Sequence, residues 1–197
     1  MKNRQIYWHI DEYKHMKEDD YKYCPLCGEL LIRMLIDKHL RQTCSSCGFV
    51  HFRNPAPTVS LLIVDGDQIL LGRRSGHFGK GSWATPSGYI EYDEDFLTTA
   101  VREAKEETGL DTEINLILNV TDSFFPPDQH FLNLYLLAYV IGGQLQAGDD
   151  MDEMRWFSLA GPLPEMAFQE DVDLIEHFKQ ACDQYLPVEG GNCREAT

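Results

Sequence analysis

Three glutamates stand close together in a run of helix-forming residues. Glu103, Glu106 and Glu107 are spaced i, i+3 and i+4, so a helix would gather them within an arc of about 100° on one face. Three carboxylates on one face repel one another, and Arg102, four residues before Glu106, offsets only part of that repulsion. A divalent cation offsets more, because Mg²⁺ characteristically binds a few carboxylates together with phosphate oxygens and water. The spacing therefore favours a metal site for phosphate chemistry.

The same run is also compatible with an ordinary solvated helix face, since Arg, Glu, Ala and Lys are good helix formers. The wider pattern decides between these two interpretations. Residues 88–110 match G-x5-E-x7-R-E-U-x-E-E-x-G-U at every fixed position, where U is apolar and the first U is the small residue Ala104. With average residue usage, such a match arises by chance on the order of 10⁻⁸ to 10⁻⁹ times per starting position.

Residues 88–110 (the box) resemble the signature box of the Nudix hydrolases, and the order of elements from 58 to 185 is similar as well. The resemblance implies an α/β fold, the Nudix α/β/α sandwich with a mixed sheet, and hydrolysis of a nucleoside diphosphate linked to another moiety. Glu94 would pair with Arg102 and brace the loop and helix. The resemblance also assigns four ligands to Mg²⁺ or Mn²⁺: Glu103, Glu106, Glu107 and the carbonyl of Gly88.

For the reaction, the resemblance implies in-line attack of a water on one phosphorus of the diphosphate. Metal ions would acidify that water and neutralise the leaving phosphate. Family members draw the general base from the helix or from a later loop, and the acidic residues at 149–153 could supply it. Glu153 is the preferred base, with a solvated loop as the alternative. Catalytic roles are thus expected for Glu103, Glu106, Arg102 and Glu153.

Four of the six cysteines form two C-x-x-C pairs, each followed by glycine. Sixteen residues separate the pair Cys24 and Cys27 from the pair Cys44 and Cys47. This spacing is typical of a zinc ribbon, because two tight turns let four thiolates converge on a tetrahedral Zn²⁺. We therefore expect a structural zinc site at residues 23–53 (the ribbon), with a supporting or dimerising role. A ribbon ahead of a Nudix domain resembles the branch that includes NADH pyrophosphatases and related dinucleotide hydrolases.

The region after the box bears on the substrate. NADH pyrophosphatases of that branch carry an S-Q-P-W-P-F-P-type array, whereas residues 121–127 read TDSFFPP. ADP-ribose pyrophosphatases tend to place a proline about sixteen residues beyond the box, where Pro126 lies, although prolines are also common turn residues. ADP-ribose is therefore expected first, and NADH or FAD next. The alternatives are a pyrophosphohydrolase for nucleoside triphosphates of the 8-oxo-dGTP type and a regulatory module that senses a nucleotide.

Several other side chains could contact such a substrate. Basic residues in the loop before the box could hold the distal phosphates of the substrate: Arg73, Arg74 and Lys80. Aromatic rings could stack on its base: Trp83, Phe124 and Phe125. The alternatives are solvated charges for the first group and core packing for the second.

The composition is acidic, with 32 Asp and Glu against 17 Lys and Arg and a formal net charge of −15. This balance disfavours non-specific nucleic-acid binding, which depends on clustered Lys and Arg. It also repels a small anionic substrate unless a cation stands between them. No stretch approaches the ~20 apolar residues of a membrane span, and no signal peptide is visible. We expect a cytoplasmic enzyme for a small nucleotide, with a homodimer as one option.

The remaining pattern predicts the elements that must position these groups. Four parts are expected: an extension at 1–22, the ribbon at 23–53, a Nudix domain at 54–187 and a tail at 188–197. The domain alternates β-branched runs with amphipathic ones. Strands are predicted at 58–64, 68–72, 83–90, 114–120, 131–141 and 154–159, and helices at 94–108 and 169–185. Gly109 is expected to end the first helix in the left-handed conformation.

Overall fold

The computed structural model describes residues 21–76, 79–125, 129–148, 150–181 and 186–187. The chain divides into two compact units. One unit comprises Met1–Ala56 with Ser123–His130, and the other comprises Pro57–Asp122 with Phe131–Thr197. The predicted extension lies outside the described residues except for its last two positions, and the predicted tail lies outside them altogether.

The ribbon contains a hairpin that the sequence did not predict. Strands β1 (Ile32–Ile36) and β2 (His39–Thr43) pair antiparallel, with Ile36 opposite His39. The two residues between them, Asp37 and Lys38, have φ angles of 48° and 68°. Positive φ at both central residues is the geometry of a type I′ hairpin turn, which Asn-Gly or Asp-Gly usually provides. The turn was missed because Asp-Lys does not carry that signal.

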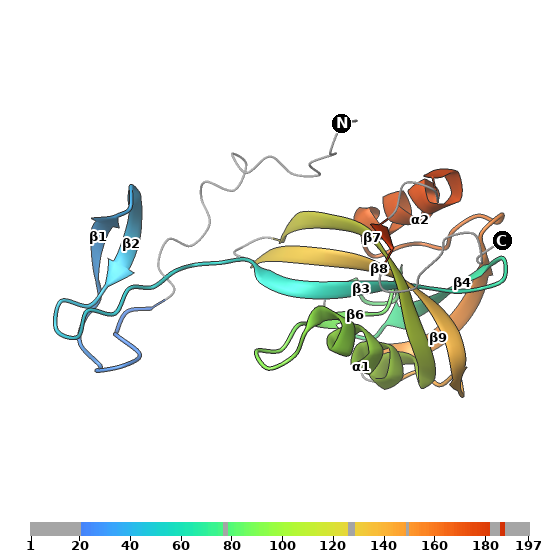
Figure 1. The fold of residues 1–197 in the computed structure, drawn as a ribbon, viewed down its shortest axis with the longest axis horizontal. Coiled ribbons are helices and arrows are strands. Elements are labelled where there is room, and N and C mark those ends of the chain that lie inside the picture. The colour runs from blue at the N-terminus through green and yellow to red at the C-terminus, as the bar shows by residue number, and fades with distance from the viewer. Residues whose placement is uncertain (1–20, 77–78, 126–128, 149, 182–185, 188–197) are drawn as a thin grey trace. The chain divides into compact units, whose positions relative to one another are not determined.

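The second unit is built around one sheet. In the described part of the chain this sheet has eight strands, with the order β10-β7-β8-β3-β4-β5, while β6 pairs with β3 and β9 pairs with β4. Figure 1 shows the long strands side by side. The strands are β3 (Ala56–Asp65), β4 (Gln68–Arg74), β5 (Trp83–Ala84), β6 (Ser87–Tyr89), β7 (Leu110–Phe125), β8 (Gln129–Gly143), β9 (Met151–Ser158) and β10 (Leu186–Pro187).

Two helices cover opposite faces of this sheet, α1 (Phe96–Thr108) on one side and α2 (Gln169–Ala181) on the other (Figure 1). Alternate residues of β3 point to each side, as the two-residue period of a strand requires. Leu61 and Ile63 pack with the α1 side, and Leu62 and Val64 pack with the α2 side. The arrangement agrees with the predicted α/β/α sandwich. Among the described residues, no helix is long and apolar enough to cross a membrane.

Helix α1 is bounded by two local signals. The side chain of Asp95 accepts hydrogen bonds from the backbone N–H groups of Leu97 and Thr98, both at 2.9 Å, so it caps the first turn. The helix therefore begins at Phe96, two residues later than predicted. Gly109 ends it with a φ of 72°, in the left-handed conformation that the sequence predicted.

Strand β7 begins four residues earlier than predicted, at Leu110. Leu110 and Thr112 are buried, whereas Asp111 and Glu113 are exposed. This alternation is that of a strand with one solvated face. In the sequence, however, two acidic residues so soon after the helix made residues 110–113 resemble a loop. The α1 helix therefore turns directly into a strand at Gly109, which fixes the direction of the helix relative to the sheet.

The start of α2 is fastened to the segment that leads into the box. The Trp83 N–H donates to the Glu165 carbonyl at 2.9 Å, and the Ala167 N–H donates to the Trp83 carbonyl at 2.7 Å. Asp171, in the first turn of α2, is buried and accepts hydrogen bonds from both the N–H and the hydroxyl of Thr85. Burial raises the pKa of Asp171 to about 7, although the Thr85 hydrogen bonds oppose this change.

We predict that Asp171→Asn stabilises the fold at high pH more than at low pH. Because the folded-state pKa of Asp171 lies above its ordinary value, the ionised carboxyl lowers stability. This cost is absent below about pH 4, grows as the pH rises to about 7 and is constant above that. Asparagine avoids the cost while keeping both hydrogen bonds. Urea denaturation at pH 8 should show a gain on the order of a few kcal/mol, and a smaller gain at pH 5.

The matched control is Asp173→Asn, since Asp173 lies on the same helix and accepts an exposed hydrogen bond from Gln169 at 2.9 Å. That variant should show no such pH dependence. A loss of stability at pH 8 in Asp171→Asn would contradict the conclusion that the ionised, buried carboxyl of Asp171 destabilises the fold.

Candidate active site and metal centre

The first residue of the box leaves room for a carboxylate. A Cβ atom placed on Gly88 would lie 2.0 Å from the Cδ atom of Glu103. Gly88 is held in β6, opposite Val59 of β3, so its backbone cannot easily move away. Any side chain at position 88 would therefore displace the carboxyl group of Glu103, and glycine is required here for space rather than for its φ angle.

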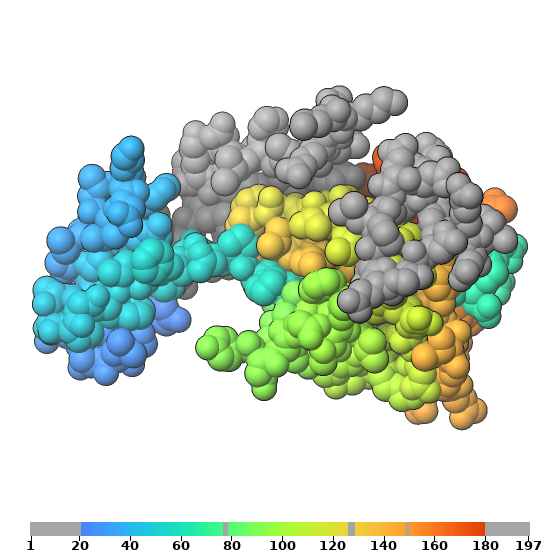
Figure 2. Space-filling model, viewed as in Figure 1, coloured from blue at the N-terminus to red at the C-terminus, as the bar shows by residue number. Residues whose placement is uncertain are grey.

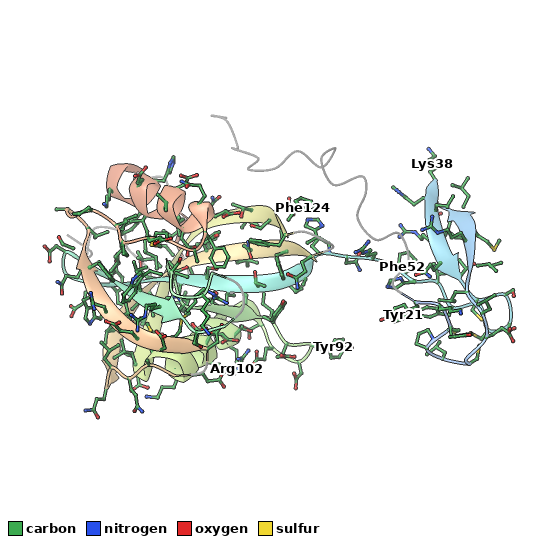
Figure 3. The ribbon with its side chains drawn as sticks, turned by 180° about the vertical axis from the view of Figure 1, so that it is seen from behind. Tyr21, Lys38, Phe52, Tyr92, Arg102 and Phe124 are labelled. Atoms are coloured by element: carbon green, nitrogen blue, oxygen red, sulfur yellow. The ribbon has the colours of Figure 1, made fainter. Side chains whose placement is uncertain are left out.

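Arg102, which is labelled in Figure 3, forms hydrogen bonds with several acidic groups of the box. Its guanidinium makes two hydrogen bonds with Glu94, at 2.7 and 2.8 Å. A single nitrogen, Nη1, donates to Glu103 at 2.7 Å and to Glu106 at 3.0 Å. The hydrogen bonds from Arg102 lower the pKa of Glu94 to about 2. The predicted pairs of Arg102 with Glu94 and with Glu106 are both confirmed.

Glu107 faces inward from the same helix. Its side chain is 2% exposed, and its Oε2 atom accepts a hydrogen bond from the backbone N–H of Ser87 at 3.0 Å. Burial raises the pKa of Glu107 above its ordinary value, and the carboxylates of Asp150 and Glu103 raise it further. The Ser87 N–H and the charge of Arg74 act in the opposite direction. The site therefore brings acidic groups together where water screens them poorly, which favours the protonated form of Glu107 when no cation is bound.

The loop before β9 brings a fourth acid to this group. Its backbone is fastened to the end of α1, because the N–H of Gly148 donates to the Glu107 carbonyl at 3.0 Å. Asp150 follows, and its Oδ2 atom accepts a hydrogen bond from Arg74 at 3.0 Å. Its Oδ1 atom is buried and has no hydrogen-bond partner among the described residues. Asp150 thus presents an available oxygen within electrostatic reach of Glu107.

These residues fit a hard divalent cation in their chemistry. The donors are carboxylate oxygens, which Mg²⁺ prefers, and Gly88 leaves the space that the Glu103 carboxyl needs. Glu106 is exposed, whereas Glu103 and Glu107 are buried. The three glutamates do not form a group whose oxygens all lie within 4.8 Å of one another; within the described residues only a cysteine cluster meets that criterion. Arg102 bridges Glu103 and Glu106 instead.

The preferred base from the sequence, Glu153, lies on β9 directly opposite Arg73 of β4. Arg73 binds Glu153 at 3.1 Å and Asp152 at 2.7 Å. Arg155 also forms an ion pair with Glu153. The carboxyl group of Glu153 is therefore engaged by two arginines, and Arg73 is engaged by two acids rather than open to a phosphate.

The other predicted substrate contacts divide between exposed and packed positions. Lys80 is exposed, whereas Trp83 is buried and meets the ring of Phe157 edge-on at 4.9 Å, so the core alternative holds for Trp83. Phe124 is buried and stacks on His130 with ring centroids 3.9 Å apart. Pro126 lies outside the described residues.

The loop between β6 and α1 stands out from the surface of the second unit (Figure 2). Tyr92 lies at its tip and is fully exposed (Figure 3). The sequence did not single this residue out.

The four predicted cysteine ligands form a cluster that could hold a metal ion. Their sulfur atoms all lie within 4.8 Å of one another, with Cys24 to Cys47 at 3.6 Å and Cys27 to Cys44 at 3.5 Å. All four are free thiols in this structure. Four sulfurs in this arrangement suit tetrahedral Zn²⁺, so the cluster can bind zinc.

The two cysteine turns have the same geometry. In the first, the Gly28 N–H donates to the Cys24 carbonyl at 2.9 Å, and in the second the Gly48 N–H donates to the Cys44 carbonyl at 3.0 Å. Gly28 and Gly48 have φ angles of 77° and 78°, which only glycine adopts at little cost. The backbone N–H of Cys47 helps lower the pKa of the Cys44 thiol to about 7. The neighbouring thiols and burial raise the pKa of Cys27 and of Cys47, so without a metal the cluster favours a thiolate at Cys44 alone among these three.

Comparisons with known proteins agree with this geometry. Residues 54–178 match the profile of the NUDIX domain. The chain is 37% identical over 132 residues to an ADP-ribose pyrophosphatase of Methanocaldococcus jannaschii. The matched region covers 65% of this chain and 76% of that protein. It is 32% identical over 153 residues to the NAD-capped RNA hydrolase NudC of Pseudomonas aeruginosa, covering 77% of this chain but only 52% of that protein. The match thus spans about half the length of NudC.

A solved structure shows the same fold. A NUDIX hydrolase from Nitrosomonas europaea superposes with a TM-score of 0.72 at 24% identity, covering 82% of this chain and 94% of that one. The α/β/α sandwich predicted from the sequence is confirmed.

We predict that the purified chain holds about one zinc ion, bound by the four clustered cysteines. Cys24→Ser should lose the zinc, because serine offers no thiolate and three sulfurs leave the tetrahedral site incomplete. Inductively coupled plasma mass spectrometry would measure the zinc content of each protein. Cys193→Ser is the control and should keep the metal, since Cys193 belongs to neither of the two C-x-x-C pairs. Full zinc content in Cys24→Ser would contradict the assignment.

Proposed function

The chain belongs to the Nudix family of hydrolases, and from this we propose that it cleaves the pyrophosphate bond of a nucleoside diphosphate linked to another moiety. ADP-ribose is the preferred substrate, with NADH or FAD next. The observation that carries this proposal is the network in which Arg102 holds Glu94, Glu103 and Glu106 beside Gly88. The Methanocaldococcus jannaschii relative named ADP-ribose pyrophosphatase supports the choice of substrate.

We assign the divalent cation, Mg²⁺ or Mn²⁺, to oxygens of the box. The proposed ligands are Glu103, Glu106, Glu107 and the carbonyl of Gly88. Such a cation supplies positive charge to the diphosphate and acidifies a water. The chain's own contribution is to hold the acids in place: Arg102 restrains Glu103 and Glu106, and the Ser87 N–H restrains Glu107.

The reaction is hydrolysis of an anhydride. The oxygen of a water forms a bond with one phosphorus, and the bond from that phosphorus to the bridging oxygen breaks. The bridging oxygen stays on the other phosphate, and the proton of the water passes to a base. ADP-ribose would give AMP and ribose phosphate. A nucleoside triphosphate, the alternative substrate, would give pyrophosphate, so the products distinguish the two.

We propose Asp150 as the base, in place of Glu153. Asp150 Oδ1 has no hydrogen-bond partner among the described residues, and the carboxyl group acts electrostatically on Glu107. Glu153 is instead paired with Arg73 and Arg155. A base needs an oxygen that is available to take a proton from water, and this requirement favours Asp150.

The substrate contacts remain proposals. Lys80 is exposed and available for a distal phosphate, whereas Arg73 and Arg74 would first have to leave their acidic partners. Phe124 and Pro126 lie in the region after the box that the sequence connects with substrate choice.

A capped RNA is the second candidate substrate, and one pair of side chains on the ribbon favours it. Apart from its cysteines, the ribbon has two more cationic than acidic side chains, a difference that a zinc ion on four thiolates would balance. Its charged residues are Arg33, Lys38, Arg41 and Arg53 against Glu29 and Asp37. The guanidinium of Arg41 lies 4.5 Å from the ring centroid of Phe52, which is exposed (Figure 3). Cations beside exposed aromatic rings are what single-stranded nucleic acid requires. The Pseudomonas aeruginosa relative is named for NAD-capped RNA.

We predict that Glu106→Gln and Glu107→Gln each lower kcat for ADP-ribose, on the order of 10² to 10⁴-fold, with the fold intact. The amide keeps the shape of the side chain but cannot carry the negative charge that binds a cation. Chromatography of the products with Mg²⁺ present would measure turnover, and circular dichroism would check the fold. ADP-ribose, NADH, FAD, NAD-capped RNA and 8-oxo-dGTP would be compared as substrates.

Glu113→Gln is the matched control, because Glu113 is an exposed acid on β7. It should keep the activity of the unchanged protein. Near-normal turnover in both box variants, or no cleavage of any of the five substrates, would end the proposal.

A separate comparison tests the base. Asp150→Asn should lower kcat on the order of 10²-fold, because the carboxyl oxygen that takes the proton is lost. Glu153→Gln should change kcat less than about tenfold, since it removes only ion pairs near the surface. Rates measured under saturating substrate and Mg²⁺ would decide. The reverse order of the two effects would return the role to Glu153.

A further inference from the structure

The short segment between β5 and β6 contacts two separate elements of the second unit. On one side, Thr85 binds Asp171 of α2: its N–H donates to Oδ2 at 2.9 Å and its hydroxyl donates to Oδ1 at 3.1 Å. On the other side, the Ser87 N–H donates to Oε2 of Glu107 on α1 at 3.0 Å. One residue, Pro86, separates the two contacts. The segment thus connects α2 with a carboxylate of the box.

This connection is stiff. Proline fixes its own φ angle, and Pro86 is buried with its carbonyl accepting a hydrogen bond from Leu61 of β3 at 2.8 Å. Ser87 then enters β6 and pairs with Ser60. Because there is little freedom between Thr85 and Ser87, a displacement of Thr85 would be passed on to the N–H that holds Glu107.

The carboxyl group of Asp171 accepts both hydrogen bonds from Thr85, and its burial lowers the stability of the folded protein. It is buried, and burial is the main cause of its raised pKa. Among the charged groups that act on it, Glu170 of the same helix raises the pKa further, and Arg74 of β4 lowers it. Arg74 also acts on Glu107 and binds Asp150. Buried acids that cost stability are more frequent near functional sites than elsewhere.

We propose that Asp171 is a positioning residue for Glu107, acting through Thr85 and Ser87. The proposal rests on the function proposed above and extends it, because it makes the affinity for the cation depend on α2. Asp171 touches neither substrate nor cation. It holds the segment from which the Ser87 N–H orients the carboxylate.

The test compares three variants of the full chain. Asp171→Ala removes both hydrogen bonds with Thr85, whereas Asp171→Asn can keep two. Its amide oxygen accepts from the Thr85 N–H, and its amide nitrogen donates to the Thr85 hydroxyl, so the second bond reverses its direction. Asp173→Asn is the control on the same helix, since Asp173 accepts an exposed hydrogen bond from Gln169. Two quantities are measured on each: the Mn²⁺ affinity by calorimetric titration, and the exchange rate of the Ser87 amide proton by mass spectrometry or NMR.

In Asp171→Ala, the Mn²⁺ affinity is expected to fall about 10 to 100-fold, as for other residues that orient metal ligands. The Ser87 amide is expected to exchange faster in the same variant. Asp171→Asn should restore both quantities to within about threefold, and Asp173→Asn should change neither. A folded Asp171→Ala protein with unchanged Mn²⁺ affinity and unchanged Ser87 exchange would overturn the proposal, because a purely structural role would lower only the stability.

Thr85→Val covers the case in which Asp171→Ala does not fold. Valine keeps the shape of threonine and the backbone N–H, but it loses the hydroxyl that binds Asp171. Its Mn²⁺ affinity is expected to fall about fivefold, the effect of one lost hydrogen bond. An unchanged affinity in this variant would again overturn the proposal.

The result also separates this proposal from the proposed function. If the unchanged protein bound no Mn²⁺ at all, the function itself would fail, and the role of Asp171 would fall with it. If the unchanged protein bound Mn²⁺ and all variants bound it equally well, only the role of Asp171 would fail.

Discussion

The structure depends above all on the repulsion among acids gathered around one helix. Glu103 and Glu107 are both buried on α1, and Asp150 is brought close to Glu107 by the loop fastened to the end of that helix. Carboxylates in a poorly hydrated place interact more strongly than in water. Arg102 is the main response to this constraint, because its guanidinium binds Glu94, Glu103 and Glu106 together. Gly88 is a second response, since it leaves the space that the Glu103 carboxyl occupies.

Parts of this site could be predicted from the sequence because they depend on short separations along the chain. The pair of Arg102 with Glu106 follows from helical spacing, and the cysteine turns follow from C-x-x-C-G. The pair of Arg102 with Glu94, which lies before the helix, was implied by the resemblance of the box. The contacts that orient Glu107 could not be predicted in this way. The Ser87 N–H is a backbone group that any residue would offer. Asp171 lies far along the chain, and it looked like an ordinary acid in the first turn of a helix.

The elements show the same difference between local and long-range signals. Helix α1 was predicted to within two residues because Asp95 and Gly109 mark its ends locally. The hairpin in the ribbon was missed because Asp37 and Lys38 adopt positive φ without the usual glycine. The pairing of β1 with β2 imposes the geometry of this turn. One cysteine pair precedes β1 and the other follows β2, so the hairpin brings the two pairs together. Such a demand comes from the assembled unit and is not visible in the turn residues.

Arg74 shows how the structure can change the interpretation of a charge. In the sequence, a basic residue before the box suggests a phosphate contact. In the structure its side chain is 14% exposed, binds Asp150 and lies over the ring of Phe168. It also opposes the rise in pKa of both Glu107 and Asp171. Arg74 is therefore the counter-charge for acids from α1, α2 and the loop before β9, as Arg102 is for the acids of the box. Both arginines are engaged by acids in this way, so the cation proposed for the box would be the nearer source of positive charge for a diphosphate.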